Sequence, residues 1–317
     1  MKLKNIVVAT EKKGYYNVLE QSCKRHNIDL IPLGMGEEWT GFTMRFNLWR
    51  DYLNTLDDDE IVMINDAYDV VILEDGDTII KKFKSFNKNI VFGDNTNISS
   101  KIIFPSCNMK KKIVCMGNII GYVKYLKQMI ELLFKYSDLW EKWNNDDQAI
   151  INDIFCKELD FFKNNVIIDT KQKLFWAGGN NMISFPIPEL FLYVNNNKIY
   201  IKNTNITPSI LHLVTNMNGN NLLKKLNYKK LPNNNIFDQP DFKNNQAFYM
   251  FKNMLILHNI SIILQIIMIS LYIGFFKINY KNFILFLLIF IFIFDYKSAI
   301  IPGSIAYLLH MIYQKII

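Results

Sequence analysis

The residues best suited to chemistry lie where a short apolar run ends in an acidic tip. Residues 60–64 have the composition of a buried strand, and the chain continues directly into Asn65-Asp66-Ala67-Tyr68-Asp69. Two carboxylates spaced three apart at a strand end are suited to a hard divalent cation such as Mg²⁺ or Mn²⁺. Proteins usually share these cations with substrate phosphates, so the tip favours a nucleotide-sugar enzyme. On these residues alone, a purely structural role for the acid pair is equally open.

The elements that must position this tip alternate between strand and helix patterns. Strands are predicted at 5–10, 29–33, 60–65 and 89–93, with helices between them at about 14–27, 43–55 and 77–86. Further elements are a strand at 113–121, a helix at 122–137, and short strands at 165–169, 190–194, 198–202 and 209–213. The pattern predicts a doubly wound α/β domain, in which ligands bind at the carboxyl ends of the strands.

A second acid pair, Asp146-Asp147, follows two asparagines and precedes a predicted helix. An aspartate at that position can cap the free N–H groups of the first helical turn, which is the structural interpretation of the pair. A carboxylate there could equally face a substrate, and the two roles are compatible. The acidic run Asp57-Asp58-Asp59 favours a solvated turn over a metal site.

Several collinear runs resemble the glycosyltransferase domain at the amino end of the procollagen lysyl hydroxylases and its viral relatives. They lie at 6–10, 34–39, 62–71, 117–122, 144–148, 168–175 and 210–212, within residues 3–228. The most specific are Gly34-Met35-Gly36-Glu37-Glu38-Trp39 and the run around Asp66-Ala67-Tyr68-Asp69-Val70. The resemblance implies an α/β fold of the GT-A, Rossmann-like type, a UDP-sugar donor and dependence on Mn²⁺ or Mg²⁺.

The same resemblance implies a role for each matching side chain. The implied metal ligands are Asp66, Asp69 and His212, although His212 could instead be a core histidine. Tyr68 would stack on uracil, and the nucleotide pocket would also be lined by Val8, Thr10 and Trp39. In the family a lysine follows the metal-binding histidine along the chain, and Lys224 is the candidate for that lysine here. The implied catalytic carboxylates, facing the donor sugar or the acceptor hydroxyl, are Asp146 and Asp147.

Two departures from the family pattern lie in the loop after Trp39. This loop is shortened, and Thr43 stands where the family carries a lysine near the phosphates, with Arg45 two residues further on. The sequence therefore supports two functions. The first is a metal-dependent transferase that moves a hexose, such as glucose, to a hydroxyl on a glycan, a collagen-like protein or a lipid. The alternative is a catalytically degenerate GT-A domain that serves as a membrane-tethered binding or scaffold module.

Composition divides the chain into three parts: a domain at 1–228, a linker at 229–253 and a membrane region at 254–317. Apolar runs at 254–276, 278–294 and 298–313 predict two or three membrane helices and a lipid bilayer as partner. Because no secretory signal is visible at the amino end, we expect an integral membrane protein with a cytosolic catalytic domain. The net charge of +7 accompanies a general enrichment in lysine, asparagine and isoleucine, so no nucleic-acid partner is expected.

Overall fold

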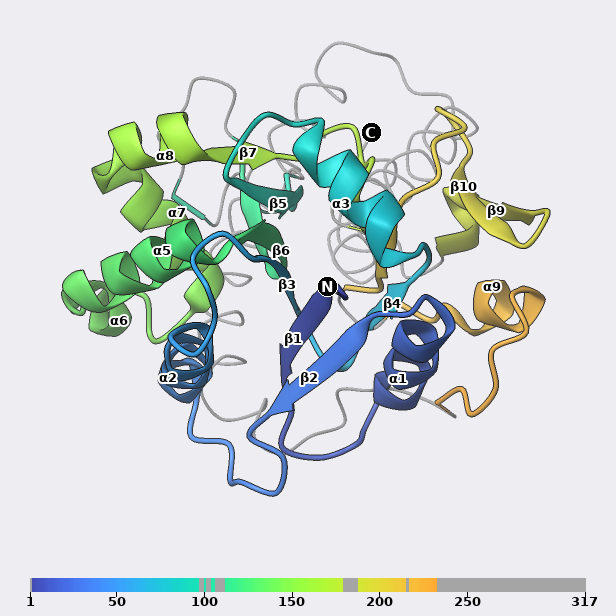
Figure 1. Ribbon diagram of the computed structural model, residues 1–317, viewed down its shortest axis with the longest axis horizontal. Coiled ribbons are helices and arrows are strands. Elements are labelled where there is room, and N and C mark those ends of the chain that lie inside the picture. Colours follow the sequence, from blue (N-terminus) through green and yellow to red (C-terminus); the bar gives the residue numbers. More distant parts are fainter. Residues whose placement is uncertain are drawn as a thin grey trace, which may run out of the picture. The chain divides into compact units, whose positions relative to one another are not determined.

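The central sheet contains β1 (Lys4–Val8), β2 (Asp29–Leu33), β3 (Ile61–Asn65), β5 (Ile90–Asp94), β6 (Val114–Tyr122) and β7 (Val166–Ile168). The structure is a computed structural model, which describes residues 2–96, 100, 104–105, 112–178, 188–214 and 217–232 (Figure 1). The strand order is β2-β1-β3-β6-β5-β7. Among these six strands only β6 runs antiparallel to its neighbours.

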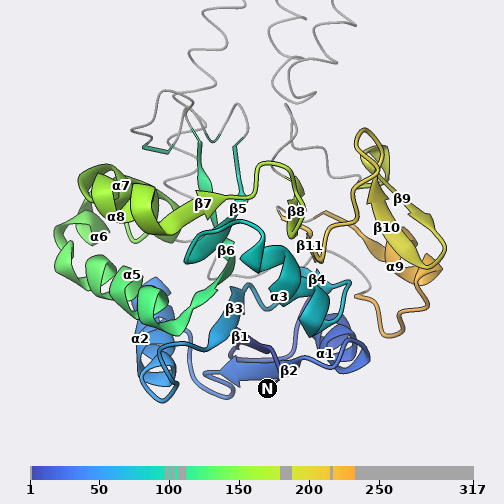
Figure 2. The ribbon, with the colours of Figure 1, turned by 45° about the horizontal axis from the view of Figure 1, so that its top comes forward.

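Helices cover both faces of this sheet (Figures 1 and 2). One face carries α2 (Phe42–Leu53), α5 (Val123–Lys135), α6 (Asp138–Lys142), α7 (Asp147–Lys157) and α8 (Leu159–Asn165). The other carries α1 (Tyr16–Arg25) and α3 (Gly76–Lys84). Successive strand side chains point to opposite faces, so Val62 and Ile64 join the first core while Met63 joins the second.

A smaller sheet flanks the second face and brings a distant part of the chain to the acidic tip. It consists of β4 (Val70–Ile72), β8 (Phe175–Ala177) and β11 (Ile210–His212), in the order β4-β11-β8. The antiparallel pairing of β11 with β4 sets His212 opposite Val70. Because Asp69 directly precedes Val70, this register places the histidine beside the second acid of the tip.

The remaining elements pack around a third hydrophobic core. These are η2 (Pro188–Leu190), the hairpin strands β9 (Leu192–Asn195) and β10 (Lys198–Ile201), and α9 (Asn220–Lys225). Asn196 and Asn197 have positive φ angles of 48° and 57°, a backbone conformation that asparagine tolerates better than most residues. Asparagines therefore form the turn between the two predicted strands.

The α/β class and most of the predicted elements are confirmed, with small differences at their ends. Two strands of three residues each, β4 and β8, were not predicted. The doubly wound pattern is interrupted by the reversed strand β6, whose direction depends on pairing partners far along the chain.

The predicted membrane localisation is corrected. Within residues 2–232, so far as they are described, no helix combines the length and apolar character needed to cross a bilayer. The longest helix there, α5, has 13 residues and measures about 20 Å at about 1.5 Å per residue, which is short of a hydrocarbon core of about 30 Å. The predicted spans at 254–276, 278–294 and 298–313 lie outside the described residues, as does most of the predicted linker.

Candidate active site

The acidic tip forms the loop between β3 of the central sheet and β4 of the smaller sheet. Its backbone is fixed at three points. The N–H of Asp66 donates to the carbonyl of Gly117 at 3.1 Å, and the carbonyl of Tyr68 accepts from the N–H of Tyr15 at 2.8 Å. The carbonyl of Asp69 accepts from the N–H of Leu213, also at 2.8 Å. The two carboxylates therefore project from a held backbone rather than from a free loop.

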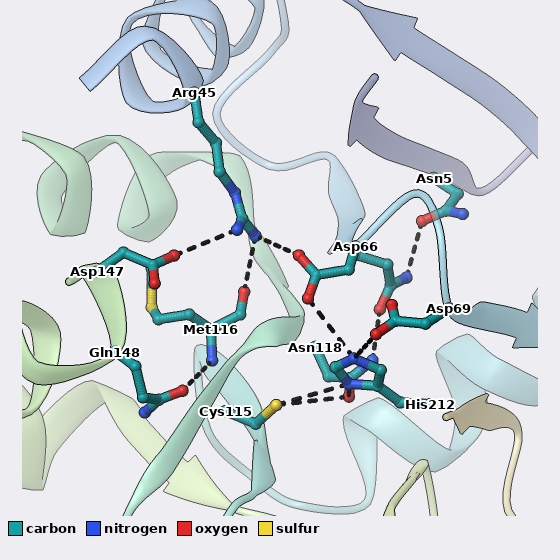
Figure 3. Close-up of polar contacts among 11 residues, drawn as sticks. Asn5, Arg45, Asp66, Asp69, Cys115, Met116, Asn118, Asp147, Gln148 and His212 are labelled. Atoms are coloured by element: carbon teal, nitrogen blue, oxygen red, sulfur yellow. Dashed lines mark hydrogen bonds and ion pairs between the residues drawn. The ribbon is translucent and has the colours of Figure 1, made fainter. Parts of the chain in front are cut away.

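The structure brings His212 to both carboxylates (Figure 3). Its Nε2 lies 3.2 Å from Asp69 Oδ2 and 3.5 Å from Asp66 Oδ2. One ligand atom of each residue falls within 4.8 Å of the other two. The three residues predicted as metal ligands thus converge on one point, although the sequence places the histidine far from the acids.

The chemistry of this cluster fits a divalent cation. Asp69 Oδ1 is buried and has no hydrogen-bond partner among the described residues, so a carboxylate oxygen is left without a positive or donating group. On the far side of the imidazole, Nδ1 of His212 lies 2.6 Å from Oδ1 of Asn118. Since a carbonyl oxygen can only accept, Nδ1 carries a proton, so Nε2 is the ring nitrogen whose lone pair is available to a cation between the carboxylates.

The electrostatics of the cluster agree with this fit. Burial raises the pKa of the Asp69 carboxyl, although the nearby histidine acts against it. Burial by itself lowers the pKa of His212, but the carboxylate of Asp69 and the sulfur of Cys115 outweigh it, and the net pKa lies well above its usual value. The site therefore favours positive charge between the carboxylates, as a proton on the imidazole or as a cation.

Arg45 of α2 connects this cluster to the second acid pair (Figure 3). Its guanidinium forms an ion pair with Asp66 Oδ1 at 2.9 Å and donates to Asp147 Oδ2 at 3.2 Å. It also donates to the carbonyl of Met116 at 3.1 Å and stacks over the ring of Trp49, 4.3 Å from the ring centroid. A buried arginine is thus shared between a candidate metal ligand and a candidate catalytic carboxylate.

The predicted cap at the start of α7 is also present. Asp146 precedes the helix, and its Oδ1 accepts from the N–H of Ala149 at 2.9 Å. Burial raises the pKa of Asp146. Burial raises the pKa of Asp147 to about 7, even though Arg45 acts to lower it. Asp146 is therefore held by the helix, while Asp147 turns toward Arg45.

An irregularity in β6 shapes the floor of the site. Phe92 and Gly93 are consecutive in β5, but they pair with Ile119 and Cys115, so three residues of β6 bulge between the paired positions. The bulge presents the carbonyls of Met116 and Gly117 to the site. A Cβ on Gly117 would lie 2.2 Å from Asp66 Oδ2. Only glycine leaves room there for the acid.

Among the residues predicted for the nucleotide pocket, Thr10 contacts the acidic tip directly. The backbone N–H of Thr10, which follows β1, donates to the hydroxyl of Tyr68 at 3.0 Å. Val8 lies half-buried at the end of the same strand. Trp39 is 40% exposed in the loop between β2 and α2, and its ring meets that of Phe42 edge to face at 5.6 Å. An exposed indole on this loop is available to a ligand.

Lys224 is placed differently from the other predicted residues. It is exposed in α9, which packs on β9 through its apolar side. Two groups in the site were not assigned by sequence reasoning. Cys115 lies 3.6 Å from Nδ1 of His212, and Asn118 holds the same nitrogen. The one available signal was the Gly117-Asn118 run, whose register opposite Asn65 only the folded sheet reveals.

The chain is similar to proteins of a known family. The family model of the PLOD GT domain matches residues 1–236. Human procollagen-lysine,2-oxoglutarate 5-dioxygenase 2 is 26% identical over 223 residues, which cover 64% of this chain and 28% of that protein. The multifunctional procollagen lysine hydroxylase and glycosyltransferase of Caenorhabditis elegans is 27% identical over 186 residues, covering 54% of this chain and 25% of that protein. The chain spans about a quarter of the length of these relatives.

The chain also has similarity to solved structures. The crystal structure of a glycosyltransferase involved in the glycosylation of the major capsid of PBCV-1 is 12% identical, with a TM-score of 0.39. That similarity covers 68% of this chain and 94% of the other.

Proposed function

The chain belongs to the PLOD GT domain family, and from that premise we propose that it is a metal-dependent hexosyltransferase of the GT-A type. It transfers a hexose, such as glucose, from a UDP-sugar to a hydroxyl group on a glycan or a collagen-like protein. The transferase domain spans residues 1–228. The observation that carries the proposal is the convergence of Asp66, Asp69 and His212, whose ligand atoms lie within 4.8 Å of one another.

These three side chains would hold Mn²⁺ or Mg²⁺. A cation bound there neutralises charge that develops on the leaving diphosphate. The carboxylates are supplied by a backbone-anchored loop and the imidazole by a sheet strand, so the ligand set is largely in place before substrate arrives. Such a preorganised set needs little rearrangement when the transition state forms.

The nucleotide would lie against the aromatic side chains of the amino-terminal half. Tyr68 stacks on the uracil ring, with its hydroxyl held by the N–H of Thr10. Trp39 covers the pocket from the loop before α2, and Val8 forms its apolar wall. Lys224 would contact the phosphates from α9.

The acceptor side is assigned to the carboxylates at the start of α7. A carboxylate whose pKa is about 7 is suited to take the proton of an acceptor hydroxyl near neutral pH, and Asp147 has that pKa because it is buried. Arg45 holds the Asp147 carboxylate in position by donating to its Oδ2. Asp146 supports its neighbour by fixing the first turn of the helix.

One observation favours a second candidate function, a non-catalytic module that binds nucleotide sugar. The guanidinium of Arg45 already pairs with both Asp66 and Asp147, at 2.9 and 3.2 Å, so its single positive charge offsets part of their negative charge and lowers the need of Asp66 for a cation. A module of this kind would bind UDP without releasing it from a UDP-sugar. The two functions differ in turnover, not in affinity for nucleotide.

The deciding experiment measures UDP release from a panel of UDP-hexoses by the purified full-length chain, with and without Mn²⁺. We expect Mn²⁺-dependent release that is lost in Asp66→Asn and in Asp69→Asn. The matched control is Asp59→Asn, which removes the same charge from an exposed turn and should keep wild-type activity. Binding of UDP without turnover on any donor would select the binding module, and activity that survives Asp66→Asn combined with Asp69→Asn would refute the metal assignment.

A further inference from the structure

Three buried asparagines form a continuous chain of side-chain hydrogen bonds that ends on His212. Asn118 Nδ2 donates to Asn65 Oδ1 at 3.0 Å, and Asn65 Nδ2 donates to Asn5 Oδ1 at 2.8 Å. At the far end, Asn5 Nδ2 lies 3.7 Å from the sulfur of Cys23. Figure 3 shows the part of this chain around the metal site. This chain of hydrogen bonds crosses β1, β3 and β6 and ends at His212 in β11.

The positions of these amides follow from strand register. Asn65 and Asn118 are directly paired across β3 and β6, while Asn5 lies on the neighbouring strand β1. All three are at most 1% exposed. A buried amide without partners costs about 1–3 kcal/mol, so three such residues among apolar strands require the bonds they make with one another.

The bonds all run in one direction. Each amide accepts through its oxygen from the side nearer His212 and donates through its nitrogen to the side further away. Turning any single amide would set oxygen against oxygen or nitrogen against nitrogen, so neighbouring amides fix one another. No amide can therefore turn alone, and the oxygen that meets His212 Nδ1 would be exchanged only if all three amides turned together.

We propose that Asn118, Asn65 and Asn5 act together as positioning residues that hold the imidazole of His212 as a metal ligand. This inference rests on the proposed metal site. The aligned amides keep the proton on Nδ1, leave the Nε2 lone pair toward the carboxylates, and turn the negative ends of their dipoles to the ring. Hydrogen-bond partners of this kind change metal affinity by about 10–100-fold when they are removed.

The Cys23 end of the hydrogen-bonded asparagines determines how they respond to a negative charge introduced at position 118. Burial raises the pKa of the Cys23 thiol to about 12, so the thiol keeps its proton and can act as a weak donor or a weak acceptor. In Asn118→Asp, one carboxylate oxygen still accepts from Nδ1. The other oxygen requires a donor, which Asn65 supplies by turning over. Asn5 then turns in the same way and accepts from the thiol.

The test compares Mn²⁺ affinity, measured by electron paramagnetic resonance on the full-length protein, with the free energy of unfolding measured without metal. Asn118→Leu should weaken Mn²⁺ binding by about 100-fold, and Asn65→Leu, one bond further away, by about 10-fold. Asn118→Asp should bind Mn²⁺ within a few-fold of wild type. Asn65→Ser, which interrupts the chain with less apolar bulk, replaces Asn65→Leu if the latter does not fold.

The matched control is Asn89→Leu. Its amide also donates to another asparagine, Asn165, at 2.8 Å, but this pair lies outside the chain to the histidine. We expect lower stability with wild-type Mn²⁺ affinity. Wild-type affinity in both Asn118→Leu and Asn65→Leu, or an equal loss in Asn89→Leu, would overturn the positioning role. Failure of the wild-type protein itself to bind Mn²⁺ would overturn the metal site as well.

Discussion

Replacing Gly117 with alanine should remove metal binding while keeping the fold. The new Cβ would lie 2.2 Å from Asp66 Oδ2 and 2.5 Å from Cε1 of His212. Ordinary contacts of a Cβ atom begin at 3.4 Å, so the carboxylate and the ring must each retreat by about 1 Å. Gly117 does not have a positive φ angle, so alanine brings no backbone strain and the effect is steric.

The size of the effect follows from this displacement. Metal–ligand distances are held to within about 0.2 Å, so a shift of about 1 Å takes two of the three ligands away from a common ion. We expect Mn²⁺ affinity and Mn²⁺-dependent turnover to fall by about 100-fold or more. Overpacking at one methyl group should lower the free energy of unfolding by about 1–3 kcal/mol.

Calorimetric titration with Mn²⁺ and denaturant unfolding without metal separate these two effects. The control is Gly121→Ala in the same strand, whose Cβ would meet the backbone oxygen of Asn89 at 2.9 Å, away from the cluster. Gly121→Ala should lose stability but bind Mn²⁺ normally. If Gly117→Ala binds Mn²⁺ with wild-type affinity, the three ligands do not share an ion at this point and the reasoning is wrong.

Three further predictions concern the surrounding residues. Arg45→Met removes the positive partner of the Asp66 and Asp147 carboxylates. Urea denaturation should show a loss of about 3 kcal/mol in unfolding free energy at pH 8, and a smaller loss at pH 6. Because burial raises the pKa of Asp147 to about 7 from 3.8, the folded state binds the extra proton, and stability should fall as pH rises from about 4 to 7, by up to about 4 kcal/mol. Asp147→Asn should remove this slope, and an unchanged slope would contradict the shift. Trp39→Ala should weaken UDP binding about tenfold, by calorimetry, without changing the melting temperature, because the indole is 40% exposed.

Local sequence determined the elements and the acidic tip. A continuous apolar run around Met63 indicates a strand buried on both faces, and the change to polar residues at Asn65 ends it. A cap at Asp146 was predictable because capping involves neighbours three residues apart. The family was recognisable from runs such as Gly34–Trp39, because their residue types and collinear order are properties of the chain alone. The predicted membrane localisation is corrected because no helix of the described residues can cross a membrane.

Tertiary structure decided which of these residues meet. The pairing of β11 with β4 sets His212 beside Asp69, and the bulge in β6 aims the carbonyl of Met116 at Arg45. The asparagine chain likewise exists only because β1, β3 and β6 lie side by side. Each of these contacts joins segments that are far apart in sequence, and their distances depend on strand order and register. Local patterns specify which face of a strand is buried, but they do not specify which strand lies next to it.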